Sequence, residues 1–133
     1  MLFRSPWIEI QQAFLESWEL RPIRAEPLYQ IARIYRMMGH PRLGYLYARM
    51  AMDLPFPDQD ILFVSEDVYK FGVLDEIAAT AFYAGKPHIG YAACKKLLQE
   101  DLLPESEIAR VRNNMEQYVK FFEQWSSMRV IVS

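Results

Sequence analysis

Apolar residues recur at intervals of three and four along most of the chain, the spacing that places them on one face of an α-helix. Phe14 and Trp18 belong to such a stripe, which predicts a helix over 6–20. The same spacing predicts a last helix over 104–125, and residues 126–133 are expected to fray. The spacing therefore predicts a helix near each end of the chain.

An internal repeat appears when the sequence is compared with itself at an offset of 46 residues. Leu28–Tyr45 and Leu74–Tyr91 then share seven identical residues out of 18. The identical pairs are Leu28/Leu74, Ile31/Ile77, Ala32/Ala78, Gly39/Gly85, Pro41/Pro87, Gly44/Gly90 and Tyr45/Tyr91. Two copies of one structural unit are the simplest interpretation.

Each copy reads as two antiparallel helices joined by a short turn. Gly39 and Gly85 supply a left-handed residue that ends the first helix. Pro41 and Pro87 follow two positions later, where a proline can begin the second helix because its missing N–H costs nothing there. Both copies are therefore predicted to be αα-hairpins.

A second glycine lies inside the second helix of each copy, at Gly44 and Gly90. Glycine costs a helix about 1 kcal/mol relative to alanine. Its presence at both equivalent positions predicts that the backbones of the paired helices approach closely there.

These elements predict one all-α domain, an antiparallel helical-hairpin solenoid of about six helices. Its expected parts are 6–20 as the second helix of a partial repeat, 25–53 as a repeat, 54–65 as an insertion loop, 66–100 as a repeat and 104–125 as a capping helix. The chain is thus expected to begin in the middle of a repeat, as a segment of a longer protein would.

The hairpins resemble tetratricopeptide repeats. Leu28, Ile31, Ala32, Tyr35, Gly39, Gly44 and Ala51 stand at that motif's spacing in the first copy. The second copy departs from the pattern, because Ala81 replaces the aromatic residue and Leu97 replaces the last small one. The resemblance implies a concave face lined by the first helix of each repeat.

A narrower resemblance covers Trp18 to Tyr118. The runs W-E-L-R-P-I-R-A-E-P-L-Y-Q-I-A-R and C-K-K-L-L-Q-E-D-L-L-P-E-S-E are similar to the tetratricopeptide region that follows family-2-type glycosyltransferase domains. This implies a non-catalytic interaction or scaffolding module within a longer glycosyltransferase-like protein.

Composition narrows the function classes. The net charge of -2 lacks the basic excess of a nucleic-acid-binding protein, so no nucleic acid partner is expected. The sequence has no apolar run long enough to span a membrane. A single cysteine, Cys94, together with the absence of a signal-peptide pattern, favours a cytoplasmic location.

Chemistry-bearing motifs are weak. Asp58 and Asp60 spell the D-x-D pattern with which many glycosyltransferases hold a cation and a nucleotide sugar, and a direct contribution to glycosyl transfer is the alternative that they leave open. Solvated loop acids are the favoured interpretation. His40 and His88 are expected to be exposed turn residues, and Cys94 to be a small buried thiol. No catalytic residue, metal site or cofactor is expected, so the segment is not predicted to be an enzyme.

Surface recognition is the function that the sequence favours, with a protein or peptide partner on the concave face. The expected partner-binding residues are Tyr29, Arg33, Arg36, Met37, Asp75, Glu76, Phe82 and Tyr83. Aromatic residues and arginines are frequent at binding hot spots. Packing against a neighbouring helix is an equal alternative for some of these residues, and self-association is a further possible role of the domain.

Overall fold

The computed structural model describes residues 6–54 and 68–132. Within these ranges the chain forms six α-helices and no strand. The helices are α1 (Pro6–Leu20), α2 (Glu26–Met37), α3 (Pro41–Met52), α4 (Val73–Thr80), α5 (Pro87–Gln99) and α6 (Glu105–Val132). A five-residue π-helical turn, Val68–Gly72, leads directly into α4. This confirms the predicted all-α, helical-hairpin fold of about six helices.

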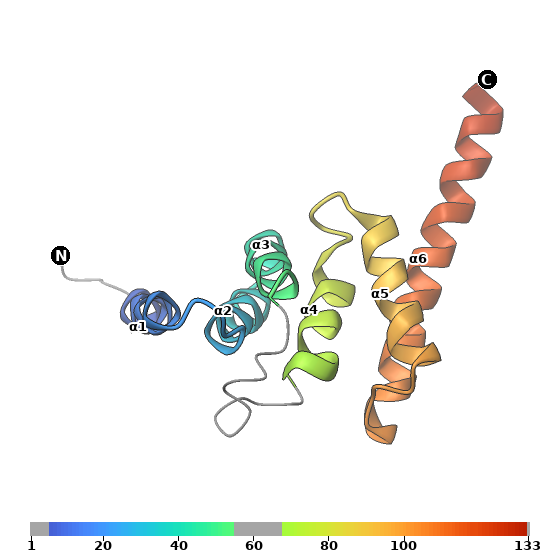
Figure 1. Cartoon of the computed structure of the whole chain (residues 1–133). Coiled ribbons are helices and arrows are strands. Elements are labelled where there is room, and N and C mark those ends of the chain that lie inside the picture. The colour runs from blue at the N-terminus through green and yellow to red at the C-terminus, as the bar shows by residue number, and fades with distance from the viewer. Residues whose placement is uncertain (1–5, 55–67, 133) are drawn as a thin grey trace.

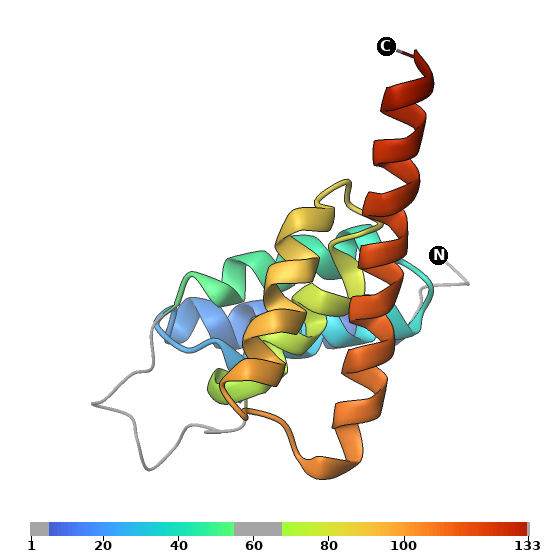
Figure 2. The same ribbon diagram turned by 90° about the vertical axis from the view of Figure 1, so that its right-hand side faces the viewer.

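The helices follow one another across the molecule in chain order (Figure 1). In that view α1, α2 and α3 are seen end-on, whereas α4, α5 and α6 are seen from the side, so the stack turns between α3 and α4. Two views at right angles show that the far end of α6 extends well beyond α5 (Figures 1 and 2). Contacts also join every second helix: α2 packs against α4, and α4 packs against α6. We call α2, α4 and α6 the first helices, because α2 and α4 are the first helices of the two hairpins and α6 occupies the next equivalent place.

The two hairpin turns have the same backbone geometry. Gly39 and Gly85 are the two glycines with positive φ, at 85° and 74°. In each turn the glycine N–H and the next N–H bond back to carbonyls of the last helical turn. The bonds are Gly39 to Arg36 (3.1 Å), His40 to Tyr35 (2.8 Å), Gly85 to Phe82 (3.2 Å) and Lys86 to Ala81 (2.9 Å). This is the Schellman arrangement, which requires a left-handed residue at the glycine.

Equivalent residues of the two copies are buried together. Ile31 and Ile77 are inaccessible to solvent, and so are Ala32 and its equivalent Ala78 to within 2%. The main core cluster runs through both hairpins into α6, where Val111 is fully buried. The last helix is therefore part of the same core as the repeats.

Gly44 and Gly90, although equivalent in the repeat, make room for different neighbours. A Cβ at Gly44 would lie 3.0 Å from the carbonyl oxygen of Ala32 in α2, which is the close backbone approach predicted for this glycine. A Cβ at Gly90 would instead fall on the ring and hydroxyl of Tyr118, which comes from α6. The space left by Gly90 is therefore filled by the next helix.

Tyr118 is held in this notch by a hydrogen bond. Its hydroxyl donates to the carbonyl oxygen of Ala78, at 2.6 Å. Ala78 is the repeat equivalent of Ala32, whose carbonyl faces Gly44. One aromatic side chain thus joins α6 to both α4 and α5.

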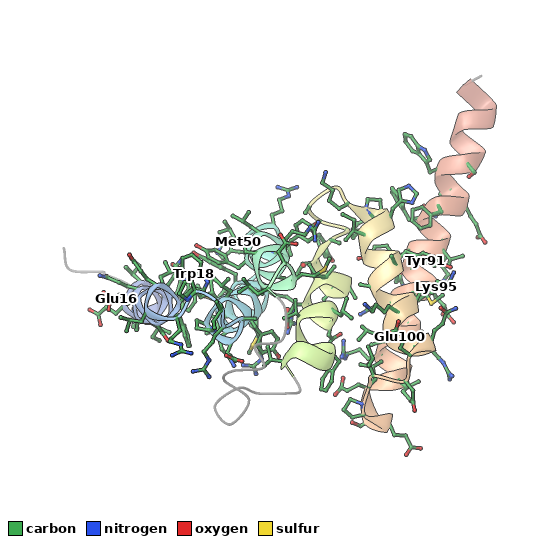
Figure 3. The ribbon with its side chains drawn as sticks, in the orientation of Figure 1. Glu16, Trp18, Met50, Tyr91, Lys95 and Glu100 are labelled. Carbon is green, nitrogen blue, oxygen red and sulfur yellow. The ribbon has the colours of Figure 1, made fainter. Side chains whose placement is uncertain are left out.

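Helix α1 is attached through aromatic and amide contacts. Tyr35 of α2 stacks on Tyr47 of α3, with ring centroids 5.7 Å apart, and packs edge-on against Trp7 of α1. The side chain of Gln11 accepts a hydrogen bond from Tyr35 at 2.9 Å and donates one to Tyr47 at 3.3 Å. Trp18 points from α1 toward the α2–α3 hairpin, whereas Glu16 lies on the outer side of α1 (Figure 3).

The last helix differs from its prediction. It continues to Val132, seven residues beyond the predicted end at Trp125, so residues 126–132 are helical and not frayed. No glycine or proline occurs between positions 105 and 133 to stop it. Most of the insertion loop predicted at 54–65, and positions 66 and 67 of the second repeat, lie outside the described residues.

The notch at Gly90 predicts an unequal pair of alanine variants. Gly90→Ala should lower the free energy of unfolding by about 2 kcal/mol, because the methyl group overlaps the pinned Tyr118 ring. Gly44→Ala should cost less, since its contact is looser and alanine favours the helix. Urea denaturation checks the ranking, and the Gly90→Ala cost should shrink in a Tyr118→Ala background. If Gly90→Ala were as stable as the native chain, the Tyr118 side chain could not fill the space beside Gly90.

The buried phenol of Tyr118 predicts a stability difference that depends on pH. Burial raises the pKa of Tyr118 from 10.0 to about 12, so the folded chain keeps this proton at pH values where the unfolded chain loses it. Its contribution to stability is complete below pH 10 and falls as the pH rises toward 12. Tyr118→Phe should be about 1 kcal/mol less stable at pH 8 because it loses one hydrogen bond. At pH 11 that gap should close, and parallel stability curves would count against the assignment.

Candidate functional site

Arg36 and Glu76, two of the predicted partner-binding residues, bind each other. The guanidinium of Arg36 in α2 donates two hydrogen bonds to the Glu76 carboxylate in α4, at 2.7 and 3.1 Å. The Glu76 side chain is only 5% exposed, and the hydrogen bond that Arg36 donates to its carboxylate is the largest cause of the raised pKa of Arg36. This pair joins the first helices of the two hairpins.

A second ion pair continues the link into α6. Asp75 of α4 accepts two hydrogen bonds from Arg110, at 2.9 and 2.7 Å. Arg110 also donates to Glu107, at 2.6 Å. The bonds to these carboxylates, the one to Asp75 first, raise the pKa of the Arg110 guanidinium. Three predicted residues (Arg36, Asp75 and Glu76) are therefore engaged in ion pairs between successive first helices.

The other predicted partner-binding residues of α2 are Tyr29, Arg33 and Met37. Tyr29 is half-buried, and its burial, followed by the negative charge of Glu76, raises its pKa. Arg33 is exposed, and Met37 at the end of α2 is 63% exposed. Arg33 and Met37 therefore offer solvent-facing surface on α2.

Phe82 and Tyr83 lie in a different place, at one wall of a groove between α4 and α6. The groove has a volume of about 480 Å³. Its lining on the α4 side is Ala78, Ala79, Phe82 and Tyr83, and its lining on α6 is Asn113, Asn114, Gln117, Tyr118, Lys120, Phe121 and Gln124. We call this feature the α4–α6 groove.

The aromatic residues of the groove form a continuous cluster. The Phe82 ring packs edge-on against Phe121, with centroids 5.2 Å apart, and against Tyr118 at 6.2 Å. Tyr83 meets Phe82 at 5.6 Å and is 55% exposed. An apolar side chain entering the groove would meet these rings at its floor and rim.

The amide side chains of the groove have unused hydrogen-bonding capacity. Within the described ranges, Asn113, Asn114, Gln117 and Gln124 make no side-chain hydrogen bond to another residue. Asn113 and Gln117 are four residues apart on one face of α6. An amide can donate and accept at once, as a peptide backbone unit does. Lys120 is the one charged side chain among the groove's lining residues.

Other residues singled out in the sequence show no catalytic arrangement. His40 and His88 are exposed, and the ring of His88 stacks on Phe122 with centroids 4.8 Å apart. Cys94 is buried, and burial raises the pKa of its thiol to about 11. Asp58 and Asp60 lie outside the described residues. Across 6–54 and 68–132, no three His, Cys, Asp or Glu side chains gather as a metal ion would need.

No helix in the described ranges combines the length and apolar character needed to cross a membrane. Comparison with known proteins found no matching family model, no similar curated protein and no similar solved structure.

Sequence reasoning found one wall of the α4–α6 groove and missed the other. Phe82 and Tyr83 were predicted, whereas Asn113, Asn114, Gln117, Lys120 and Phe121 were not. The available signal was the presence of four amide side chains between positions 113 and 124 of one predicted helix. What the arrangement can do chemically is bind: it presents donors, acceptors and aromatic rings, and no nucleophile paired with a base.

The ion pair between α2 and α4 predicts a clear contrast between two arginines one turn apart. Arg36→Met should lower the free energy of unfolding by about 2–3 kcal/mol, because it leaves the buried Glu76 carboxylate without its partner. Exposed Arg33→Met should change stability by less than about 0.5 kcal/mol. Adding Glu76→Gln to Arg36→Met should restore part of the loss in urea denaturation. Equal effects of the two arginine variants would rule out a structural role for this pair.

Proposed function

We propose that this chain is a non-catalytic protein-interaction module that holds an extended peptide segment of its partner in the α4–α6 groove. The observation that carries the proposal is that one groove pairs amides that make no hydrogen bond to another described residue with an aromatic cluster in which Phe82 and Tyr83 are exposed. Amides can bind the peptide backbone irrespective of its sequence, and the rings can take an apolar side chain.

The rigidity of the groove supports this function. Tyr118 fixes α6 against α4 and α5. The ion pair between Asp75 of α4 and Arg110 of α6 joins the two walls of the groove a second time. A preformed groove loses little conformational freedom on binding, which improves affinity for a given set of contacts. The groove can therefore receive a peptide without rebuilding its walls.

The wider role rests on the resemblance seen in the sequence. Two hairpins with equivalent glycine turns and buried small residues are compatible with a tetratricopeptide-type scaffold. Placement of the module within a longer glycosyltransferase-like protein is part of the same proposal, supported by the runs beginning at Trp18 and Cys94. Its task there would be to bring a partner to the attached domain.

Selection of peptides from a displayed library on the purified chain tests the proposed groove. For a selected peptide, Gln117→Ala should weaken binding by about tenfold, the effect of losing one or two hydrogen bonds at an interface. Tyr83→Ala should weaken it by tenfold or more, because an exposed aromatic ring at the groove rim is a typical hot spot. Isothermal titration calorimetry gives the affinities.

Gln99→Ala is the matched control. Gln99 is an exposed amide at the end of α5 and does not line the α4–α6 groove. Its replacement should leave the affinity unchanged, and circular dichroism should show the same helical content in all three variants. Selected peptides that bind Gln117→Ala and Tyr83→Ala as tightly as the native chain would sink the proposed site.

A further inference from the structure

A separate cleft lies between the second helices of the two hairpins. It has a volume of about 620 Å³ and is bordered by α3 and α5, with α4 beneath them. This volume is within the range of small-molecule sites in proteins, about 300–1,000 Å³. None of its lining residues also lines the α4–α6 groove.

The cleft is apolar in its floor and basic at its walls. Leu74 and Ile77 of α4 contribute to the floor, and Ile89 and Ala92 belong to the α5 wall. The charged and titratable side chains among its lining residues are Arg49, His88 and Lys96, and no acidic residue lines it. Helices α3 and α5 contain no Asp or Glu at all.

The cations come from both walls. Arg49 belongs to α3, and Lys96 belongs to α5. Within the described ranges Lys96 makes no ion pair, whereas Arg49 lies 3.6 Å from the carboxylate of Asp53, which is 72% exposed. An anion entering between the walls would meet the ammonium group of Lys96, which has no ion-pair partner within the described ranges, and a guanidinium whose contacts are the exposed Asp53 carboxylate and the sulfur of Met52, at 3.8 Å.

We propose that this cleft binds a single-chain amphiphile with an anionic head. The apolar floor would take the alkyl chain, while Lys96 and Arg49 would hold the head at the walls. Charge complementarity selects this occupant over a neutral apolar ligand, because two cations border an otherwise apolar surface without an acid among the lining residues. The role is separate from peptide binding in the α4–α6 groove.

A chain-length series tests the apolar half of the proposal. Hexanoate, octanoate and decanoate are titrated into the full chain by calorimetry, below the concentration at which each forms micelles. Each added methylene group should tighten binding by about three- to fourfold, the gain from burying it. Decyl phosphate distinguishes a phosphate head from a carboxylate head, and decanol reports the tail alone. Decanol binding as tightly as decanoate would overturn the anionic selection.

Two adjacent lysines provide the matched pair for the charged half. Lys96→Gln should weaken decanoate binding by about tenfold, because the ammonium partner is lost. Lys95→Gln should have no effect, since Lys95 is exposed, does not line the cleft and is drawn on the side of α5 toward α6 (Figure 3). Asp53→Asn should tighten binding two- to threefold by removing the competing carboxylate beside Arg49. Equal effects of the two lysine variants would overturn the proposal.

Steric closure of the cleft gives an independent check. Ala92 is exposed on the cleft wall, so Ala92→Trp should fill the cleft without disturbing the core, and decanoate binding should disappear at unchanged thermal stability. Light scattering on the native chain and on Ala92→Trp tests whether a second copy of the chain occupies the cleft instead. If the cleft is instead an interface between two copies, the native chain would be dimeric and would not bind decanoate, and Ala92→Trp would be monomeric. That result would replace the proposal.

Discussion

The phenol of Tyr118 occupies the space that any side chain at position 90 would need, and its hydroxyl reaches the carbonyl of Ala78. The contact needs a residue without a Cβ on α5, an accepting carbonyl on α4 and a long aromatic side chain on α6. Because it fixes three helices at one point, it sets how far α6 lies from α4. That distance defines the α4–α6 groove, so the proposed binding site depends on a contact beneath it.

The repeat positions explain why this contact could form. At the equivalent position in the first hairpin, Gly44 lets α3 approach the Ala32 carbonyl directly. In the second hairpin the equivalent glycine, Gly90, and the equivalent carbonyl, that of Ala78, both contact Tyr118. A glycine kept for close packing thus serves in one copy as a docking notch for another helix. The ion pairs Arg36–Glu76 and Asp75–Arg110 add two further links along the first helices.

The parts of the fold that could be predicted are those controlled by local backbone requirements. Gly39 and Gly85 adopt the left-handed conformation because a chain reversal of this type demands it, and the prolines after them begin helices. The apolar faces could also be predicted, because apolar residues three and four positions apart fall on one side of a helix. The role of Tyr118 could not be predicted in this way, because its partners are 28 and 40 residues away in the sequence and its own helix gives no sign of them.

Candidate binding residues were harder to separate from structural ones. Exposed arginines and acids in a repeat look alike in the sequence, yet Glu76 is buried against Arg36 whereas Arg33 faces solvent. Only the relative placement of α2 and α4 distinguishes them. The same holds for the amides of α6, which become a candidate site because α4 brings Phe82 and Tyr83 opposite to them.

Hydrogen exchange on the full chain, with and without a selected peptide, shows whether the α4–α6 groove is the binding surface. If it is, peptide binding slows amide exchange in residues 78–83 and 113–124 and leaves α3 unchanged. Protection confined to α3 and α5, with both walls of the α4–α6 groove unaffected, would rule the groove out as the binding surface.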